Sequence, residues 1–278
     1  MRRLILFFSI FCSVAVAAQT PVDSLEAQPY YILIGEAEEA LADDRLSDAA
    51  ARLREAMQVD PDNPGNVLLL SNLGVIYWRC DEDSLALDVL NEANRRAPSM
   101  VTVLLNRGRL LLDMGHNREA YEDFNEVVAL DSANCPARYY RGTMSLYGGR
   151  LDMAEKDFDV LKKLKPKALD TAVALSALYS LSGRDREAVP YFERLVEEDP
   201  APEYFAGLAG CLLALQDYTR AAEVIEGGLK RYSHDPELYY YRAWLNRDRY
   251  RLDDARSDAA KAVEYGASKT KVDALFAR

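Results

Sequence analysis

The sequence predicts an all-α fold, a solenoid of about seven helix–turn–helix repeats. Three observations lead to this prediction. A small-residue pattern recurs about every 34 residues, the apolar residues within each period are spaced as on one face of a helix, and short polar stretches separate the two halves of a period. The chain has 278 residues, 49% hydrophobic and 28% charged, which is the composition of a globular protein.

The clearest recurring residue is an alanine, whose copies lie 33 to 37 residues apart at Ala49, Ala86, Ala120, Ala154, Ala188, Ala221 and Ala255. Four residues after each alanine the chain has Leu53, Leu90, Phe124, Phe158, Phe192, Ile225 or Ala259. Twelve residues before it stands a small residue: Ala37, Gly74, Gly108, Gly142, Ser176, Ala209 or Ala243. Many periods close on a proline, as at Pro61, Pro98, Pro166, Pro200 and Pro236.

This pattern resembles the tetratricopeptide repeat (TPR) family, which has a small residue at position 8, alanine at 20, a large residue at 24 and proline at 32. The second repeat matches nearly throughout, with Leu70, Leu73, Gly74, Tyr77, Ala86, Leu90, Ala93 and Pro98. Repeats starting near residues 30, 67, 101, 135, 169, 202 and 236 give an array over 30–267. The resemblance implies a right-handed superhelix, with the first helix of each pair (helix A) lining the concave face.

Each small residue has a physical role in this pattern. Positions 8 and 20 are expected to meet where helix A crosses the second helix (helix B), while the residue at 24 fills the gap alongside. Charged residues interrupt the pattern at position 7, where Glu36, Arg107, Arg141 and Arg242 replace apolar side chains. The pair Gly227–Gly228 inside a helix B predicts a bend or a soft joint.

The N-terminus has the order of a secretory signal peptide. Arg2 and Arg3 precede an apolar run over 4–16, and small residues at 15–18 offer a cleavage site. We therefore expect a signal peptide at 1–18, a flexible lead-in at 19–29, and an exported mature chain in the periplasm or outside the cell. The run is too short for a typical membrane span, although an uncleaved N-terminal anchor is the alternative. The last segment, 268–278, is expected to cap the array.

Charge and cysteine content narrow the classes of partner. The formal net charge of −11 argues against nucleic acid, because an acidic chain is repelled by phosphate backbones. Beyond the signal peptide the cysteines are Cys80, Cys135 and Cys211, an odd number at wide spacing. They are expected to be buried small residues rather than a disulfide framework.

The predicted binding surface is the concave groove, which positions 2, 5, 6, 9, 12 and 13 of helix A would line. Many of these residues are Tyr, Trp or Arg, the types that carry binding energy at interfaces. The resemblance also implies that asparagines at position 6 pair with the backbone of an extended peptide. The alternative is that some aromatics fill gaps between repeats or lie under the C-terminal cap. The candidate groove residues are Asn72, Trp78, Arg79, Asn106, Arg109, Tyr139, Tyr140, Tyr147, Tyr240, Tyr241 and Trp244.

Nothing in the sequence predicts an enzyme, a cofactor or a metal site. The two histidines, His116 and His234, fall in turns without a metal-binding partner at helical spacing. The stretch 60–65 has some likeness to a calcium loop but lacks its third and twelfth ligands, so an inter-repeat turn is the better interpretation. The carboxylate clamp of chaperone-binding TPR domains is only half present, so its ligand is not carried over.

The sequence therefore predicts a non-catalytic scaffold or adaptor in the cell envelope that binds an extended peptide or protein partner. The alternative is a periplasmic assembly factor or chaperone for envelope proteins, which would use the same groove with weaker selectivity. No integral membrane span is expected in the mature chain, and the pattern carries no signal for an oligomeric state.

Overall fold

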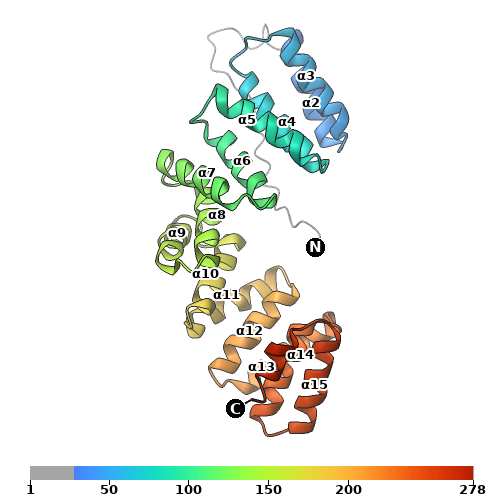
Figure 1. Ribbon diagram of the computed structural model, residues 1–278, viewed down its shortest axis with the longest axis vertical. Helices are drawn as coiled ribbons and strands as arrows, with labels where there is room; N and C mark the ends of the chain where they lie inside the picture. The colour runs from blue at the N-terminus through green and yellow to red at the C-terminus, as the bar shows by residue number, and fades with distance from the viewer. Residues whose placement is uncertain (1–27, 278) are drawn as a thin grey trace. The chain divides into compact units, whose positions relative to one another are not determined.

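The computed structural model describes residues 28–277, and all regular structure in that range is helical (Figure 1). The all-α prediction is therefore confirmed. The expected signal peptide and residues 19–27 of the expected lead-in lie outside the described residues. The helices are α2 (Pro29–Ala42), α3 (Leu46–Val59), α4 (Asn66–Arg79), α5 (Asp83–Arg96), α6 (Val101–Asp113), α7 (Asn117–Leu130), α8 (Cys135–Tyr147), α9 (Leu151–Leu164), α10 (Leu169–Leu181), α11 (Asp185–Glu198), α12 (Pro202–Ala214), α13 (Tyr218–Arg231), α14 (Pro236–Asp248), α15 (Leu252–Glu264) and α16 (Lys269–Asp273).

Successive helices pack as hairpins, with the even-numbered helix of each pair as helix A and the next as helix B. The pairs α2–α3, α4–α5, α6–α7, α10–α11, α12–α13 and α14–α15 each make an extensive contact. The described chain forms two compact units, residues 28–141 and residues 142–277, and the division falls within α8.

Every turn from helix A to helix B contains one residue in the left-handed region, at position 15 of the repeat. Glycine fills it three times and Tyr250, with a φ of 59°, is the bulkiest exception. The next residue then bonds back to the end of helix A, as when the His116 N–H donates to the Leu111 carbonyl at 2.8 Å. This geometry closes helix A and reverses the chain in very few residues. The seven residues are Asp44, Asp81, Gly115, Gly149, Gly183, Gln216 and Tyr250.

The glycines at position 8 allow helices A and B to approach closely. A Cβ atom placed on Gly142 would lie 2.4 Å from Cε1 of Phe158, and one on Gly108 would lie 2.9 Å from Cε1 of Phe124. The same atom on Gly74 would lie 2.6 Å from Cγ of Leu90. The nearest atoms to these added Cβ positions thus belong to the residue at position 24, and the expected contact between positions 8 and 20 stays a prediction.

The glycine pair in α13 also serves a close approach. Helix α13 runs without a break from Tyr218 to Arg231, and the bend or soft joint expected at its two glycines stays a prediction. A Cβ atom on Gly228 would come within 2.8 Å of Leu238 and 3.1 Å of Phe205. Glycine is therefore required at this point because side chains from both α12 and α14 press against the α13 backbone.

Two arginines at position 7, Arg107 and Arg242, contact aspartates sixteen residues later, at position 23. Arg107 donates two hydrogen bonds to the buried carboxylate of Asp123, at 2.9 Å and 2.6 Å. Arg242 makes the same bidentate contact with the buried Asp258, at 2.9 Å and 2.5 Å. Burial raises the pKa of Asp123, while the hydrogen bonds from Arg107 oppose that rise. Each pair therefore joins helix A to helix B with a charge contact that carries a desolvation cost.

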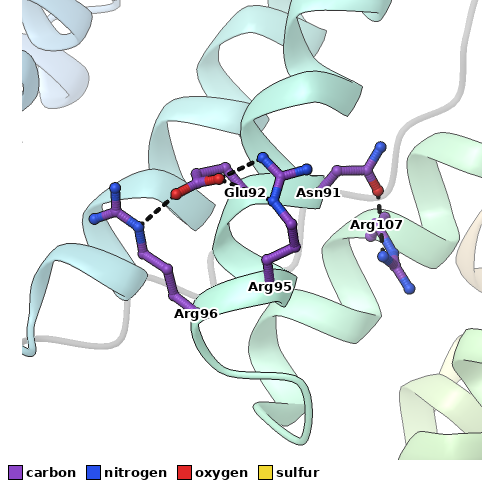
Figure 2. Close-up of polar contacts among 5 residues, drawn as sticks. All are labelled: Asn91, Glu92, Arg95, Arg96 and Arg107. Atoms are coloured by element: carbon purple, nitrogen blue, oxygen red, sulfur yellow. Dashed lines mark hydrogen bonds and ion pairs between the residues drawn. The ribbon is translucent and has the colours of Figure 1, made fainter.

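The first repeat uses the same two positions with the charges reversed. There Arg52, at position 23, lies 3.1 Å from Glu36, at position 7. Arg107 also reaches the preceding repeat, where it donates to the side-chain oxygen of Asn91 at 3.2 Å (Figure 2). In these three repeats the charge at position 7 is thus matched by an opposite charge on helix B, while Arg141 donates to the side-chain oxygen of Asn125 at 2.8 Å.

Figure 2 also shows, on the same helix as Asn91, the carboxylate of Glu92 between Arg95 and Arg96. These are pairs within one helix at i,i+3 and i,i+4, in which both arginines are exposed and Glu92 is partly exposed. Such surface pairs contribute little to stability, in contrast to the buried contacts of Arg107 and Arg242.

The C-terminal segment packs on the last helix pair. Val272 and Leu275 are buried in one apolar cluster with alanines of α14 and α15, and α16 begins after a Ser268 side chain that caps it. The cysteines differ from expectation, because only Cys211 is buried, whereas Cys80 is exposed and Cys135 is partly exposed. Burial raises the pKa of the Cys211 thiol to about 12, so it remains protonated and behaves as a small apolar residue.

We expect Gly142→Ala to lower the free energy of unfolding by about 1–3 kcal/mol, because its methyl group would overlap the fully buried ring of Phe158. That loss exceeds the gain of about 1 kcal/mol that alanine normally gives in a helix. The control is Gly35→Ala in α2, where no atom lies within 4 Å of the added Cβ, so this variant should be neutral or stabilised. Urea unfolding of both variants measures the contrast, and an equal gain in both would contradict the account.

The pair at positions 7 and 23 gives a second test. Arg107→Leu should cost about 3–5 kcal/mol of unfolding free energy, because it leaves the Asp123 carboxylate buried without its bidentate partner. The double variant Arg107→Leu/Asp123→Val reproduces Leu73 and Val89 of the second repeat and should recover most of that loss.

The control for this test is Arg118→Ala, whose side chain is 90% exposed and which should stay within about 0.5 kcal/mol of the parent. Thermal and urea unfolding give the three values. A double variant as unstable as the single one would show that the charge pair itself is not the source of the loss.

Candidate peptide-binding face

Three side chains from successive A helices form a stack in the unit of residues 28–141. The guanidinium carbon of Arg109, on α6, lies 5.4 Å from the ring centroid of Trp78 on α4 and 5.8 Å from that of Tyr140 on α8. The Trp78 indole is only 5% exposed and donates from Nε1 to Asp113 at 2.9 Å. The arginine is therefore held between two aromatic rings, one of them fixed by a hydrogen bond.

The Tyr140 ring is held in place by two neighbouring aromatic rings. It stacks on the buried ring of Phe124 with centroids 5.1 Å apart, and Tyr139 meets it edge-on at 5.5 Å. Both tyrosines remain partly exposed. Since Phe124 is the position-24 residue that rests on Gly108, the repeat core directly positions this aromatic surface.

The two predicted asparagines have different environments. Asn106 is 4% exposed, and its amide nitrogen donates to the Ser71 hydroxyl at 3.0 Å, so it joins α6 to α4. Asn72 is half-buried, and within residues 28–277 its side chain hydrogen-bonds to no other group. Of the two amides, only that of Asn72 is open to an incoming peptide.

Arg79, the last residue of α4, is held by an ion pair. Its guanidinium lies 2.6 Å from the Asp44 carboxylate in the turn between α2 and α3, and the arginine side chain is mostly covered. The face formed by Asn72, Trp78, Arg79, Arg109, Tyr139 and Tyr140 therefore combines apolar rings, paired charges and one open amide. Such a surface can bind a peptide through apolar contact and backbone hydrogen bonds.

The remaining predicted groove residues belong to the unit of residues 142–277. Tyr240 and Trp244 pack against the apolar cluster of the C-terminal cap, as the alternative in the sequence analysis describes. The Lys271 ammonium of α16 lies 4.2 Å from the Tyr240 ring centroid and pairs with Glu237. Tyr147 stands apart and is 74% exposed. The binding role of these residues stays a prediction.

Tyr241 fits into a space that a glycine leaves open. A Cβ atom on Gly210 would lie 3.0 Å from the Tyr241 hydroxyl oxygen, and burial raises the pKa of Tyr241 well above its usual range. Its ring stacks on Trp244 with centroids 6.2 Å apart. The sequence showed the aromatic content here, but it left open whether these rings line the groove or lie under the C-terminal cap.

Sequence reasoning missed the polar contacts that fix the start of α4. The Tyr30 hydroxyl donates to Asn66 at 3.0 Å, while the amide nitrogen of Asn66 donates to the Asp60 and Pro61 carbonyls. Burial raises the pKa of Tyr30 to about 12. Asparagine at the first residue of α4, directly after a turn, was the available signal.

In the part of the chain that the structure describes, no group of three or more His, Cys, Asp and Glu side chains is arranged to hold a metal ion. Over the same residues, 28–277, no helix combines the length and the apolar character needed to cross a bilayer.

Comparison with curated proteins finds similarity to mitochondrial import receptor subunit TOM70. The mouse protein is 25% identical over 184 residues, which cover 63% of this chain and 30% of the mouse protein. The human protein is 24% identical over the same length. The chain thus spans less than a third of the length of these relatives.

Solved structures with a similar fold include a tetratricopeptide repeat protein from Parabacteroides merdae, with a TM-score of 0.64 and 26% identity over 89% of this chain and 97% of that one. Pseudomonas aeruginosa PilF has a TM-score of 0.68 at 18% identity, covering 77% of this chain and 97% of PilF. PilW, a type IV pilus biogenesis factor, has a TM-score of 0.65 at 20% identity, covering 76% and 97%. At these identities PilF and PilW show the fold alone.

A family model for the tetratricopeptide repeat matches residues 34–101, 105–168, 182–236 and 212–269, which together make up most of the chain. These matches coincide with the helix pairs and with the close approach of helices A and B at the glycines. The chain therefore belongs to the tetratricopeptide repeat family.

Proposed function

We propose that this protein is a non-catalytic scaffold or adaptor of the cell envelope, and that it binds an extended, partly apolar segment of a protein partner. The proposed site is the face of α4, α6 and the start of α8 in the unit of residues 28–141. The observation that carries the proposal is the Trp78–Arg109–Tyr140 stack, which presents a fixed cation and the partly exposed ring of Tyr140, while Asn72 adds an open amide on α4, the helix that also holds Trp78.

The chemistry of this face suits a peptide backbone. The Asn72 amide offers both a donor and an acceptor, which is what an extended peptide presents in return. Arg109 is held between rings before the partner arrives, so little side-chain entropy is lost on binding. Tyr139 and Tyr140 add apolar area at low entropic cost.

The proposed location rests on the sequence before residue 19, where two arginines, an apolar run and small residues follow one another. The N-terminal sequence of the mature protein, taken from cells, decides this: a start at residue 19 supports export, and retention of Met1 contradicts cleavage.

The second candidate is an assembly factor or chaperone that receives many envelope proteins. One observation favours it. Asn106 hydrogen-bonds to Ser71 within the protein, so only the Asn72 amide of this pair is open to select among peptide sequences. Binding to a peptide array separates the two functions. A single consensus supports the adaptor, and scattered apolar hits support the chaperone.

For the adaptor we expect Asn72→Ala to weaken binding of the partner peptide about 3- to 10-fold, because it removes hydrogen bonds worth about 0.5–1.5 kcal/mol. Arg109→Ala should weaken it more, by about 30-fold, since it removes the residue that the two rings hold in place. Calorimetry on a partner found by proximity labelling in cells measures both values.

The matched control is Arg118→Ala on α7, which removes an exposed arginine without touching the proposed face. It should bind as the parent does, and circular dichroism should show all three variants folded. Unchanged affinity in Asn72→Ala and Arg109→Ala would refute the assignment of this face.

A further inference from the structure

The turn between α9 and α10 concentrates positive charge in an otherwise acidic protein. Lysine stands at four of the six positions 162–167, although the whole chain has only nine lysines and a net charge of −11. We call residues 162–167 the lysine turn. All six residues are exposed, including Leu164 at 51%. Within residues 160–170 the one acid is Asp170, so this segment carries a net charge of about +3.

The backbone of the lysine turn is held in one conformation. Arg194 of α11 donates to the Pro166 carbonyl at 3.4 Å and also to the Lys167 carbonyl. The Ala168 N–H closes the turn on the Lys165 carbonyl at 3.1 Å. A partner would therefore meet a preformed loop and lose little conformational entropy in ordering it.

The first lysine of the turn is also oriented by an aromatic ring. The Lys162 ammonium donates to the Tyr179 hydroxyl at 3.4 Å, and this contact raises the pKa of Lys162. A second cation contacts the same ring, because the guanidinium carbon of Arg184 lies 4.4 Å from the Tyr179 ring centroid. Arg184 already pairs with Glu155 and Glu187. The net positive charge of this region therefore comes from residues 160–170, with about +3.

The surroundings of the turn decide which anion fits. Asp159 on α9 is exposed, and Glu198 sits beside the turn because Arg194 binds it at 2.6 Å. A broad anionic surface, such as a lipid bilayer or a nucleic acid, would meet these carboxylates and the net charge of the chain. A narrow polypeptide segment can contact the lysines alone.

We propose that the lysine turn binds an acidic segment of a protein partner, with carboxylates on the lysines and an apolar side chain on Leu164. This site lies on α9, the following turn and α11, none of which contributes to the face proposed above. It is a second docking surface, independent of the peptide-binding face.

The test uses the full chain and a short fluorescent peptide of glutamate, aspartate and one leucine. Fluorescence anisotropy should show binding at low ionic strength that weakens as salt is added. The variant Lys163→Glu/Lys165→Glu/Lys167→Glu should weaken binding more than about tenfold. The control is Lys156→Glu/Lys230→Glu/Lys269→Glu, which changes the net charge by the same amount as the turn variant but at exposed sites outside the turn. It should weaken peptide binding by less than about a third of the loss seen with the turn variant.

Each outcome bears on the proposal. Loss of peptide binding in the turn variant but not in the control variant supports the proposal. The variant Asn72→Ala/Arg109→Ala should bind the acidic peptide normally, whether or not the peptide-binding face on α4, α6 and α8 is correctly assigned. Equal loss in the turn and control variants, no binding at low salt, or tighter binding to phosphatidylglycerol vesicles than to the peptide would each overturn it. Lys163→Gln/Lys165→Gln/Lys167→Gln replaces the charge-reversed variant if circular dichroism shows that variant unfolded.

Discussion

The close approach of helix A to helix B at position 8 is the constraint on which the rest of the fold depends. Where that residue is glycine, the ring or branched side chain at position 24 rests directly on the helix A backbone, as Phe124 does on Gly108. This contact fixes the distance and rotation of each hairpin. Rotation in turn decides which side chains of helix A enter the core and which remain on the surface. The Tyr140 ring stacks on Phe124, so the contact between Phe124 and Gly108 also sets the position of Tyr140.

The period of the fold was predictable because the same packing problem recurs and is solved each time with small residues at positions 8 and 20. The arginines at position 7 looked like departures, since each partner lies sixteen residues away on another helix. A search for opposite charges at that spacing would have found Glu36 with Arg52 as well as Arg107 with Asp123. The reversal of sign between these two repeats shows that the requirement is for a complementary pair, not for one residue type.

The candidate site was predictable only in composition. Sequence position places Asn72 and Asn106 at equivalent points of successive A helices, yet Ser71 binds Asn106 and leaves Asn72 open. Tyr240 and Trp244 have the spacing of groove residues, but the cap helix α16 gives them an apolar neighbour. Both outcomes depend on contacts between different repeats or with the C-terminus, which a pattern within one repeat does not encode. The lysine turn has no repeat signature at all, because its charge is unique to one inter-repeat connection.

The most direct test of the account asks whether a partner touches the A-helix face of residues 28–141 in the cell. A photo-crosslinking amino acid placed at position 139, beside the stacked rings, is compared with the same amino acid at position 118 on the exposed surface of α7. We expect a discrete protein adduct after illumination at position 139 and none at position 118. Adducts only at position 118, or equal adducts at both positions, would contradict the assignment of partner binding to this face.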